Sequence, residues 1–238
     1  MSKNLVYFSV NERYIECLNF NLTLIKKMTP SCFDVCCIIP KGLNGIVSDI
    51  PTFVLPEPFS LHSSRFSIVQ WENFENYNNF LYLDADAVLV KSPNMIFDVI
   101  ERQPEFIHGV KEKENISDVT DSFFRFTTDD IYGYTGFNSG TFGFNRKMKN
   151  VICEFIEYIN ANKHMALNDQ PLYNEFFNGK KNILPTLSNF VYLKDPIRLY
   201  DINKINTISK REATIIHFLG RYGDLDYKLT AIKEEFKQ

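Results

Sequence analysis

Short apolar segments that alternate with helical segments constrain the fold of this chain more than any other feature. The first two apolar segments, LVYFSV (5–10) and FDVCCIIP (33–40), have the length of strands. Between them, from Glu12 to Met28, apolar residues recur at the spacing of an amphipathic helix. Strands that alternate with helices predict a parallel or mixed sheet that is covered on both faces.

The same alternation continues to the end of the chain. Further strands are expected at 52–55, 80–83, 87–90, 105–110, 139–145 and 214–218. Further helices are expected at 66–78, 94–100, 152–159, 169–177 and in a C-terminal tail at 222–238. Because 238 residues without a repeat or a linker suit one domain, we expect residues 1–238 to form a single α/β domain. Its central sheet should be mixed, mostly parallel and flanked by helices.

Composition and charge argue against several classes of partner. The formal net charge of −3 gives no overall field that would attract nucleic acid. No apolar run approaches the ~18 residues of a membrane span. The N-terminal residues MSKNLVYFSV lack the apolar core of a signal peptide. We therefore expect a cytoplasmic protein with reduced cysteines, no membrane span and no nucleic-acid partner.

The apolar run FLYL (80–83) leads directly into two acids, Asp84 and Asp86. Ligands of open α/β sheets bind just beyond the carboxyl ends of the strands. Two carboxylates separated by one residue can turn toward one point where the chain leaves a strand. Their oxygens suit a hard divalent ion, Mg²⁺ or Mn²⁺, which often bridges phosphate oxygens. A strand-end turn with two solvated acids is the alternative interpretation.

An apolar strand followed by D-x-D is also the nucleophile motif of haloacid-dehalogenase-type phosphatases. In such an enzyme Asp84 would be phosphorylated, and Asp129 with Asp130 could form the later acid pair. That motif usually opens the fold, whereas here about eighty residues of strand and helix precede it. No convincing Ser/Thr or Lys motif lies between the two acid pairs. The phosphatase is therefore the weaker interpretation.

A stretch rich in small and amide residues, GFNSGTFGFNR (136–146), offers a second set of ligand-binding groups. It is expected to place Asn138, Ser139 and Gly140 at a turn that enters a strand. Small residues and an amide at such a turn allow close approach to the hydroxyl groups of a ligand.

Two later stretches, NDQPL and IIHFLGR, add further polar side chains that could bind a ligand. NDQPL puts Asp169 and Gln170 at the start of a helix, where Asp169 could equally be an N-cap. IIHFLGR puts His217 on an apolar strand, followed by Gly220 and Arg221. A lone histidine on such a strand is usually a core residue, but beside two carboxylates it can be a third metal ligand.

Taken together and in order, YLDAD, FNSG, DQ and HFLG resemble glycosyltransferase family 8, which includes glycogenin and bacterial galactosyl- and glucosyltransferases. The likeness spans roughly residues 5 to 221. It implies a GT-A fold, a nucleotide-sugar donor that is usually UDP-linked, and a bound Mn²⁺ or Mg²⁺. It also implies transfer of a hexose to an acceptor hydroxyl with retention of anomeric configuration. Binding of a nucleotide sugar without turnover, or transfer to the protein's own tyrosines, stay open as alternatives.

The resemblance assigns roles to individual positions. It implies that Asp84, Asp86 and His217 hold the metal, and that Asp169 and Gln170 act beside the anomeric carbon. The implied donor contacts are Phe8, Val10, Asn11, Tyr14, Arg65, Asp84, Ala85, Asn138, Ser139, Gly220 and Arg221. Among these, Phe8 and Val10 would use backbone atoms, and Tyr14 would offer its ring to the uracil.

One departure from the family concerns the diphosphate. The family often has a lysine a few residues after HFxG, whereas Gly223 stands near that position here. Arg221 is expected to replace the lysine through a bidentate phosphate contact. Residues 111–134, a long polar stretch with several aromatic side chains, are expected to form a loop that faces the acceptor.

Overall fold

The strands form two sheets in a computed structural model of the protein. The structure describes residues 3–28, 32–43, 47, 50–56, 61–113, 136–162, 169–183, 189–192, 210–218 and 225–236. Within them, the large sheet has the strand order β3-β2-β1-β4-β7-β6-β8 and the small sheet the order β5-β10-β9. The strands of the large sheet are β1 (Asn4–Ser9), β2 (Phe33–Pro40), β3 (Thr52–Leu55), β4 (Asn79–Leu83), β6 (Ile107–Lys113), β7 (Gly136–Asn145) and β8 (Lys181–Ile183). Those of the small sheet are β5 (Ala87–Leu89), β9 (Asn189–Tyr192) and β10 (Ile215–Phe218).

Helices connect and cover these strands. The α-helices are α1 (Ile15–Lys26), α2 (Leu61–Ser64), α3 (Asn94–Arg102), α4 (Lys149–Asn162), α5 (Asp169–Phe176) and α7 (Leu225–Glu235). The 3₁₀ helices are η1 (Glu12–Tyr14), η2 (Lys41–Leu43), η3 (Ser67–Gln70), η4 (Phe74–Asn76) and η7 (Arg146–Met148). No helix of the described residues is both long enough and apolar enough to cross a membrane.

The large sheet is mixed and mostly parallel, which confirms the prediction from the alternating segments. Strand β1 pairs in parallel with β2 and β4, β2 with β3, and β6 with β8. Strand β7 runs antiparallel to both of its neighbours, β4 and β6. The antiparallel strand was not predicted, because the sequence of an apolar run does not indicate whether the strand will run parallel or antiparallel to its neighbours.

Alternate side chains of the central strands enter two separate hydrophobic cores. Phe8 and Leu83 belong to the core on one face, whereas Tyr7 and Tyr82 belong to the core on the other face. Neighbouring side chains of a strand point to opposite faces, so a strand buried on both sides is apolar throughout. This explains why the central strands read as continuous apolar runs in the sequence.

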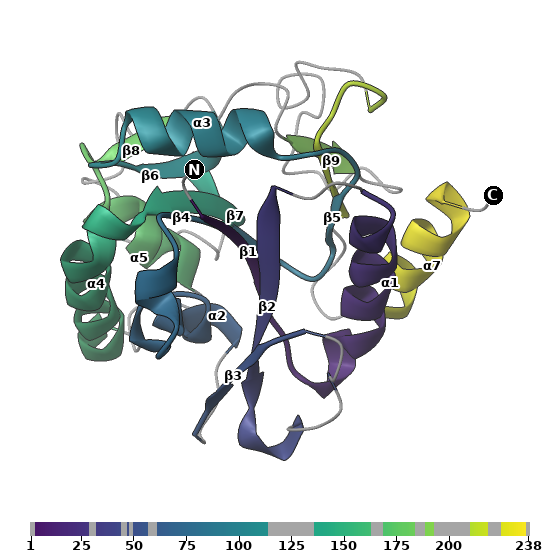
Figure 1. Cartoon of the computed structure of the whole chain (residues 1–238), viewed down its shortest axis with the longest axis horizontal. Helices are drawn as coiled ribbons and strands as arrows, with labels where there is room; N and C mark the ends of the chain where they lie inside the picture. Colours follow the sequence, from purple (N-terminus) through teal and green to yellow (C-terminus); the bar gives the residue numbers. More distant parts are fainter. Residues whose placement is uncertain are drawn as a thin grey trace.

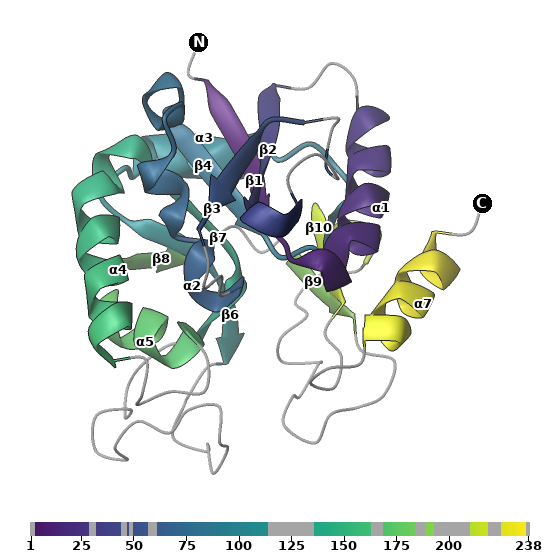
Figure 2. The ribbon, with the colours of Figure 1, turned by 90° about the horizontal axis from the view of Figure 1, so that it is seen from below.

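Different helices cover the two faces. Apolar residues of α1, α3, α7 and the small sheet fill the first core, and those of η3, η4, α4 and α5 fill the second. Figures 1 and 2 both show α1 and α7 side by side at one end of the molecule, with α4 and α5 at the other. The large sheet separates the two cores, and the small sheet and α7 lie on the side of the first core.

The segment predicted as helical at 66–78 is helical only in part. The segment forms two short 3₁₀ helices, η3 and η4, separated by irregular backbone. Trp71 after η3 and Tyr77 after η4 both have extended backbone, so each short helix ends there. Ile68, Trp71, Phe74 and Tyr77 are all buried, as are Phe66 and Val69.

The second core is built on stacked aromatic rings, and Phe80 lies in the middle of one stack. Its ring centroid is 4.4 Å from that of Phe74 and 5.0 Å from that of Phe144. We expect Phe80→Ala to lower the free energy of unfolding by about 3–5 kcal/mol in urea denaturation, because it leaves a cavity between two rings. Met95→Ala, at a side chain that is 54% exposed on α3, should change it by less than about 0.5 kcal/mol. Equal losses in the two variants would contradict this account of the core.

Candidate metal centre

A tight turn carries the chain from the large sheet into the small one. Strand β4 ends at Leu83, and the backbone N–H of Ala87 donates to the Asp84 carbonyl at 2.8 Å. The Asp84 N–H donates to the carbonyl of Gly140 on β7 at 2.7 Å. The extended segment predicted at 87–90 is therefore present, but as β5 of the second sheet. The two acids lie in the turn between the sheets.

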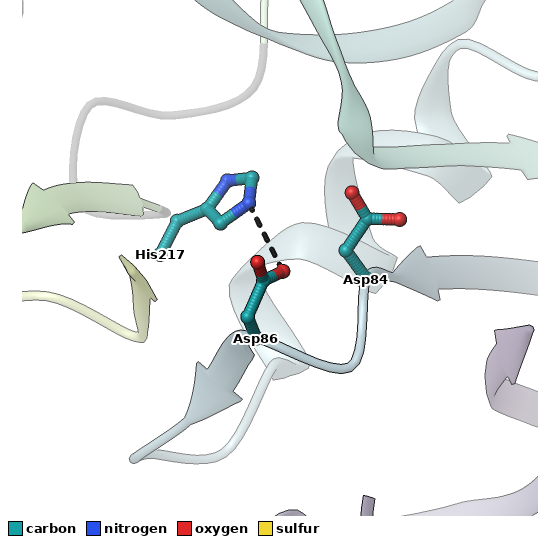
Figure 3. Close-up of side chains that lie close together, drawn as sticks. All are labelled: Asp84, Asp86 and His217. Carbon is teal, nitrogen blue, oxygen red and sulfur yellow. Dashed lines mark ion pairs between the residues drawn. The ribbon is translucent and has the colours of Figure 1, made fainter. Parts of the chain in front are cut away.

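The pairing of β10 with β5 brings His217 to the same turn. His217 lies opposite Ala87 in the antiparallel register, and the Phe218 N–H donates to the Asp86 carbonyl at 2.9 Å. The Nε2 atom of His217 lies 3.5 Å from Oδ1 of Asp86 (Figure 3). Asp84, Asp86 and His217 each place one possible metal-binding atom in the cluster, and these three atoms lie within 4.8 Å of one another.

The three side chains fit a divalent cation. Two carboxylates and one imidazole form an oxygen-rich donor set that suits Mn²⁺ or Mg²⁺. His217 is only 2% exposed, and its Nδ1 atom has no hydrogen-bond partner among the described residues. The nitrogen of His217 that faces the acids is Nε2, 3.5 Å from Oδ1 of Asp86, so Nε2 is the atom that can bind an ion there. We therefore treat this cluster as a candidate metal centre.

The absence of a side chain at Gly140 provides the space that Asp84 and His217 occupy. A Cβ atom at this position would lie 2.4 Å from Oδ2 of Asp84 and 2.7 Å from Cε1 of His217. The register between β6 and β7 shifts here, from Gly109 opposite Phe142 to Val110 opposite Asn138. Such an irregularity re-aims side chains of a strand. The expected turn at Asn138–Gly140 is thus wrong, because these residues lie inside β7 at its irregular part.

Arg65, which follows α2, forms an ion pair with the first acid. One of its guanidinium nitrogens lies 3.4 Å from Oδ1 of Asp84 and donates to the Ser139 carbonyl at 2.6 Å. The guanidinium also lies over the ring of Tyr82, whose hydroxyl donates to Oδ1 of Asp84 at 2.5 Å. Arg65 is therefore buried and fixed between β4 and β7, next to the candidate metal centre.

Lys228 of α7 forms an ion pair with the second acid, and sequence reasoning gave it no role. Its ammonium donates a hydrogen bond to Oδ2 of Asp86. Burial would raise the pKa of the Asp86 carboxyl, but the Lys228 ammonium and His217 hold that pKa well below its usual range. Burial would likewise lower the pKa of Lys228, but the carboxylate of Asp86 raises it above its ordinary value. Both groups of the pair are thus held in their charged forms.

Asn21 on α1 holds the backbone on both sides of Asp86. Its amide nitrogen donates to the carbonyls of Ala85 and Ala87 at 3.0 and 3.2 Å, and its amide oxygen accepts from Leu89 N–H at 3.1 Å. Asn21 is fully buried, and this amide satisfies three backbone groups at the point where the chain changes sheets. Sequence reasoning missed this role, because a polar residue on a helix gives no sign of its distant partners.

Gln170 and Asn174 attach α5 to β7 beside the site. The Ser139 N–H donates to Oε1 of Gln170 at 3.1 Å, and Asn174 exchanges two hydrogen bonds with the backbone of Phe137 at 2.8 and 2.9 Å. Asn138 accepts the N–H of Gly140 at 2.7 Å. Asp169 is the first residue of α5, but its side chain lies outside what the structure describes.

The predicted nucleoside-binding residues lie where β1 leads into α1. Phe8 and Val10 are fully buried, and the Val10 N–H donates to the Ile38 carbonyl at 3.0 Å. Asn11 caps η1 by accepting the N–H of Arg13 at 3.1 Å. Tyr14 ends η1, partly buried against the first core. Ala85 is buried in the turn between the two acids.

Several predicted residues lie outside the described part of the chain. They are Gly220, Arg221 and the greater part of the acceptor-side segment 111–134, of which the structure describes only 111–113 at the end of β6. Their predicted roles stay predictions.

Comparisons with known proteins agree with this arrangement. The model of the family named glycosyl transferase family 8 matches residues 59–222, well over half of the chain. No curated protein matches the sequence. Among solved structures, the galactosyltransferase LgtC in complex with donor and acceptor sugar analogues is similar, with a TM-score of 0.66 and 14% identity over 98% of this chain and 96% of LgtC.

Two further structures share the fold. The bifunctional glycosyltransferase WbbM is similar with a TM-score of 0.65 and 16% identity, over 98% of this chain and 51% of WbbM. The glycosyltransferase GlyE of Streptococcus pneumoniae TIGR4 has a TM-score of 0.59 and 13% identity, over 99% of this chain and 63% of GlyE. These likenesses confirm the predicted GT-A fold.

The close approach at Gly140 gives a direct test of the metal centre. We expect Gly140→Ala to weaken Mn²⁺ binding by about tenfold or more, because the added methyl group displaces Asp84 and His217. Electron paramagnetic resonance of free Mn²⁺ during titration measures this. Gly42→Ala in η2 is the matched control, since its added Cβ would meet no atom within 4 Å. Unchanged Mn²⁺ affinity in Gly140→Ala would contradict the assigned centre.

Proposed function

The chain belongs to glycosyl transferase family 8, and on this basis we propose that it transfers a hexose from a UDP-sugar to an acceptor hydroxyl. The observation that carries the proposal is the cluster of Asp84, Asp86 and His217 within the matched region. Two acids and a histidine beyond the carboxyl end of a sheet strand form a site for a cation that holds a diphosphate.

Asp84, Asp86 and His217 would hold Mn²⁺ or Mg²⁺. A divalent ion at this position supplies Lewis-acid stabilisation of the charge that develops on the departing nucleoside diphosphate. Arg65, fixed 3.4 Å from Asp84, adds a positive charge on the same side. The charge of Arg65 acts without reorganisation, because its side chain is buried and hydrogen-bonded in place.

The nucleoside would bind between the end of β1 and the turn of the two acids. Tyr14 supports this placement because it ends η1, directly after β1, and is partly buried against the first core. Its ring would stack on the uracil while Asn11 contacts the polar edge of the base. Gly220 and Arg221 are proposed to complete the diphosphate contacts.

The sugar would lie beside β7 and the start of α5. Asn138 and Ser139 would contact its hydroxyl groups, and Asp169 or Gln170 would stabilise the anomeric carbon as positive charge develops there. Gln170 supports this role because its oxygen lies 3.1 Å from the backbone N–H of Ser139, next to the candidate metal centre. We propose retention of anomeric configuration, with the acceptor hydroxyl attacking from the face that the nucleotide leaves. Residues 111–134 are proposed to face the acceptor.

No observation favours the haloacid-dehalogenase-type phosphatase. The family match covers Asp84 and Asp86, and the second acid pair, Asp129 and Asp130, lies outside the described residues. Transfer to the protein's own tyrosines is tested by mass spectrometry, which would show mass increases in hexose steps after incubation with donor. Reaction in the cytoplasm stays a prediction.

The donor site is tested by a thermal-shift panel of UDP, GDP, CDP and ADP, each with and without Mn²⁺. We expect the largest stabilisation with UDP plus Mn²⁺; a ligand at a hundredfold excess over Kd adds about 2.7 kcal/mol. Asp86→Asn should abolish this shift, because it removes a charged metal ligand. Asp98→Asn, at an exposed acid on α3, should retain it. If no nucleotide shifts the wild-type protein, the proposed donor site is wrong.

Gln170 is tested by donor hydrolysis, which needs no acceptor. We expect Gln170→Ala to lower kcat for hydrolysis of a UDP-hexose on the order of 10²-fold and to leave UDP affinity unchanged, because the side chain would act at the sugar carbon. Gln70→Ala, at an exposed residue of η3, is the matched control. The anomer that is released first, followed by NMR, reports the stereochemistry. A loss of UDP affinity that equals the loss of kcat would contradict the role given to Gln170.

A further inference from the structure

The acids of the candidate metal centre are already balanced by two cations of the chain. Asp84 pairs with Arg65 at 3.4 Å, and Asp86 pairs with Lys228 through a hydrogen bond to Oδ2. The two negative charges and the two positive charges cancel. Three of the four side chains are no more than 15% exposed, so water screens this cluster poorly.

The two cations differ in how firmly they are held. The guanidinium of Arg65 also donates to the Ser139 carbonyl and lies 5.2 Å from the centroid of the Tyr82 ring. Lys228 reaches Asp86 from α7 on a flexible four-carbon stem that ends in a compact charge. Of the two side chains, Lys228 is therefore the one that can move away from its carboxylate when another cation binds there.

Lys228 and His217 engage different oxygens of the same carboxylate. Oδ2 of Asp86 accepts from Lys228, and Oδ1 lies 3.5 Å from Nε2 of His217. A divalent ion bound by Asp86 and His217 would stand beside the lysine ammonium. Without an anion, that arrangement would place two surplus positive charges in a poorly screened site, which electrostatics disfavours.

We propose that Lys228 is an internal counter-ion of the metal centre that makes binding of the divalent ion depend on an anionic diphosphate. This inference rests on the proposed function. The diphosphate of the donor supplies the negative charge that the balanced cluster lacks, so ion and nucleotide each raise the affinity of the site for the other. By thermodynamic linkage, the two increases are equal.

The coupling is measured by titrating Mn²⁺ with and without saturating UDP, using the electron paramagnetic resonance signal of free Mn²⁺. In the wild-type protein we expect weak Mn²⁺ binding alone and binding at least about tenfold tighter with UDP. Lys228→Gln keeps a hydrogen-bond donor for Asp86 but removes the charge. In this variant we expect tighter binding of Mn²⁺ alone and a coupling factor that falls severalfold toward one.

Three further variants separate charge from structure. Lys228→Met removes both charge and donor, and should move the coupling in the same direction as Lys228→Gln. Lys228→Arg keeps the charge and should retain the coupling. Lys233→Met, on the same helix but paired with Glu16, should behave as the wild type. Thermal unfolding of every variant shows whether α7 and the core stay folded.

The possible outcomes are distinguishable. Unchanged coupling in folded Lys228→Gln and Lys228→Met overturns the counter-ion role and leaves the proposed function standing. Weaker Mn²⁺ binding in these variants, both with and without UDP, shows a merely structural role and also overturns it. A wild-type protein that binds neither Mn²⁺ nor UDP overturns the proposed function and the counter-ion role together.

Discussion

The turn from Asp84 to Ala87 is the constraint on which the arrangement of the site depends. Here the chain leaves the large sheet and enters the small one, held by the hydrogen bond between Asp84 and Ala87 and by the Asp84 N–H bond to Gly140. The buried amide of Asn21 satisfies three backbone groups around the same turn. Because the backbone is fixed on both sides, the two acids stay in one place while their carboxylates face polar partners.

Every other component of the centre reaches this turn through a separate part of the chain. The pairing of β10 with β5 delivers His217, and the irregular part of β7 delivers Gly140 and Ser139. α7 packs its apolar residues into the first core and brings Lys228 to Asp86. Packing of the cores therefore sets the electrostatics of the site, since a shift of α7 or β10 would separate a charge from its partner.

The parts of the site that were predictable are those with a local signature. Asp84 and Asp86 end an apolar run, and His217 lies on another, so their places at strand ends and on strands followed from spacing alone. Lys228 has no such signature, because it lies eleven residues beyond His217 on a polar helix. Asn21 and Tyr82 were equally hidden, since their hydrogen bonds join segments that are distant in sequence or depend on the turn.

The sequence by itself determined the alternation of strands and helices, the apolar cores and the order of the ligand-bearing motifs, because these depend on local periodicity and on which residue types leave water. Tertiary structure alone decided the antiparallel direction of β7, the passage of β5 into a second sheet and the ion pair of Lys228 with Asp86. Each depends on hydrogen bonds or charges between segments far apart along the chain, and the free energy of such contacts is set by geometry that only the folded protein has.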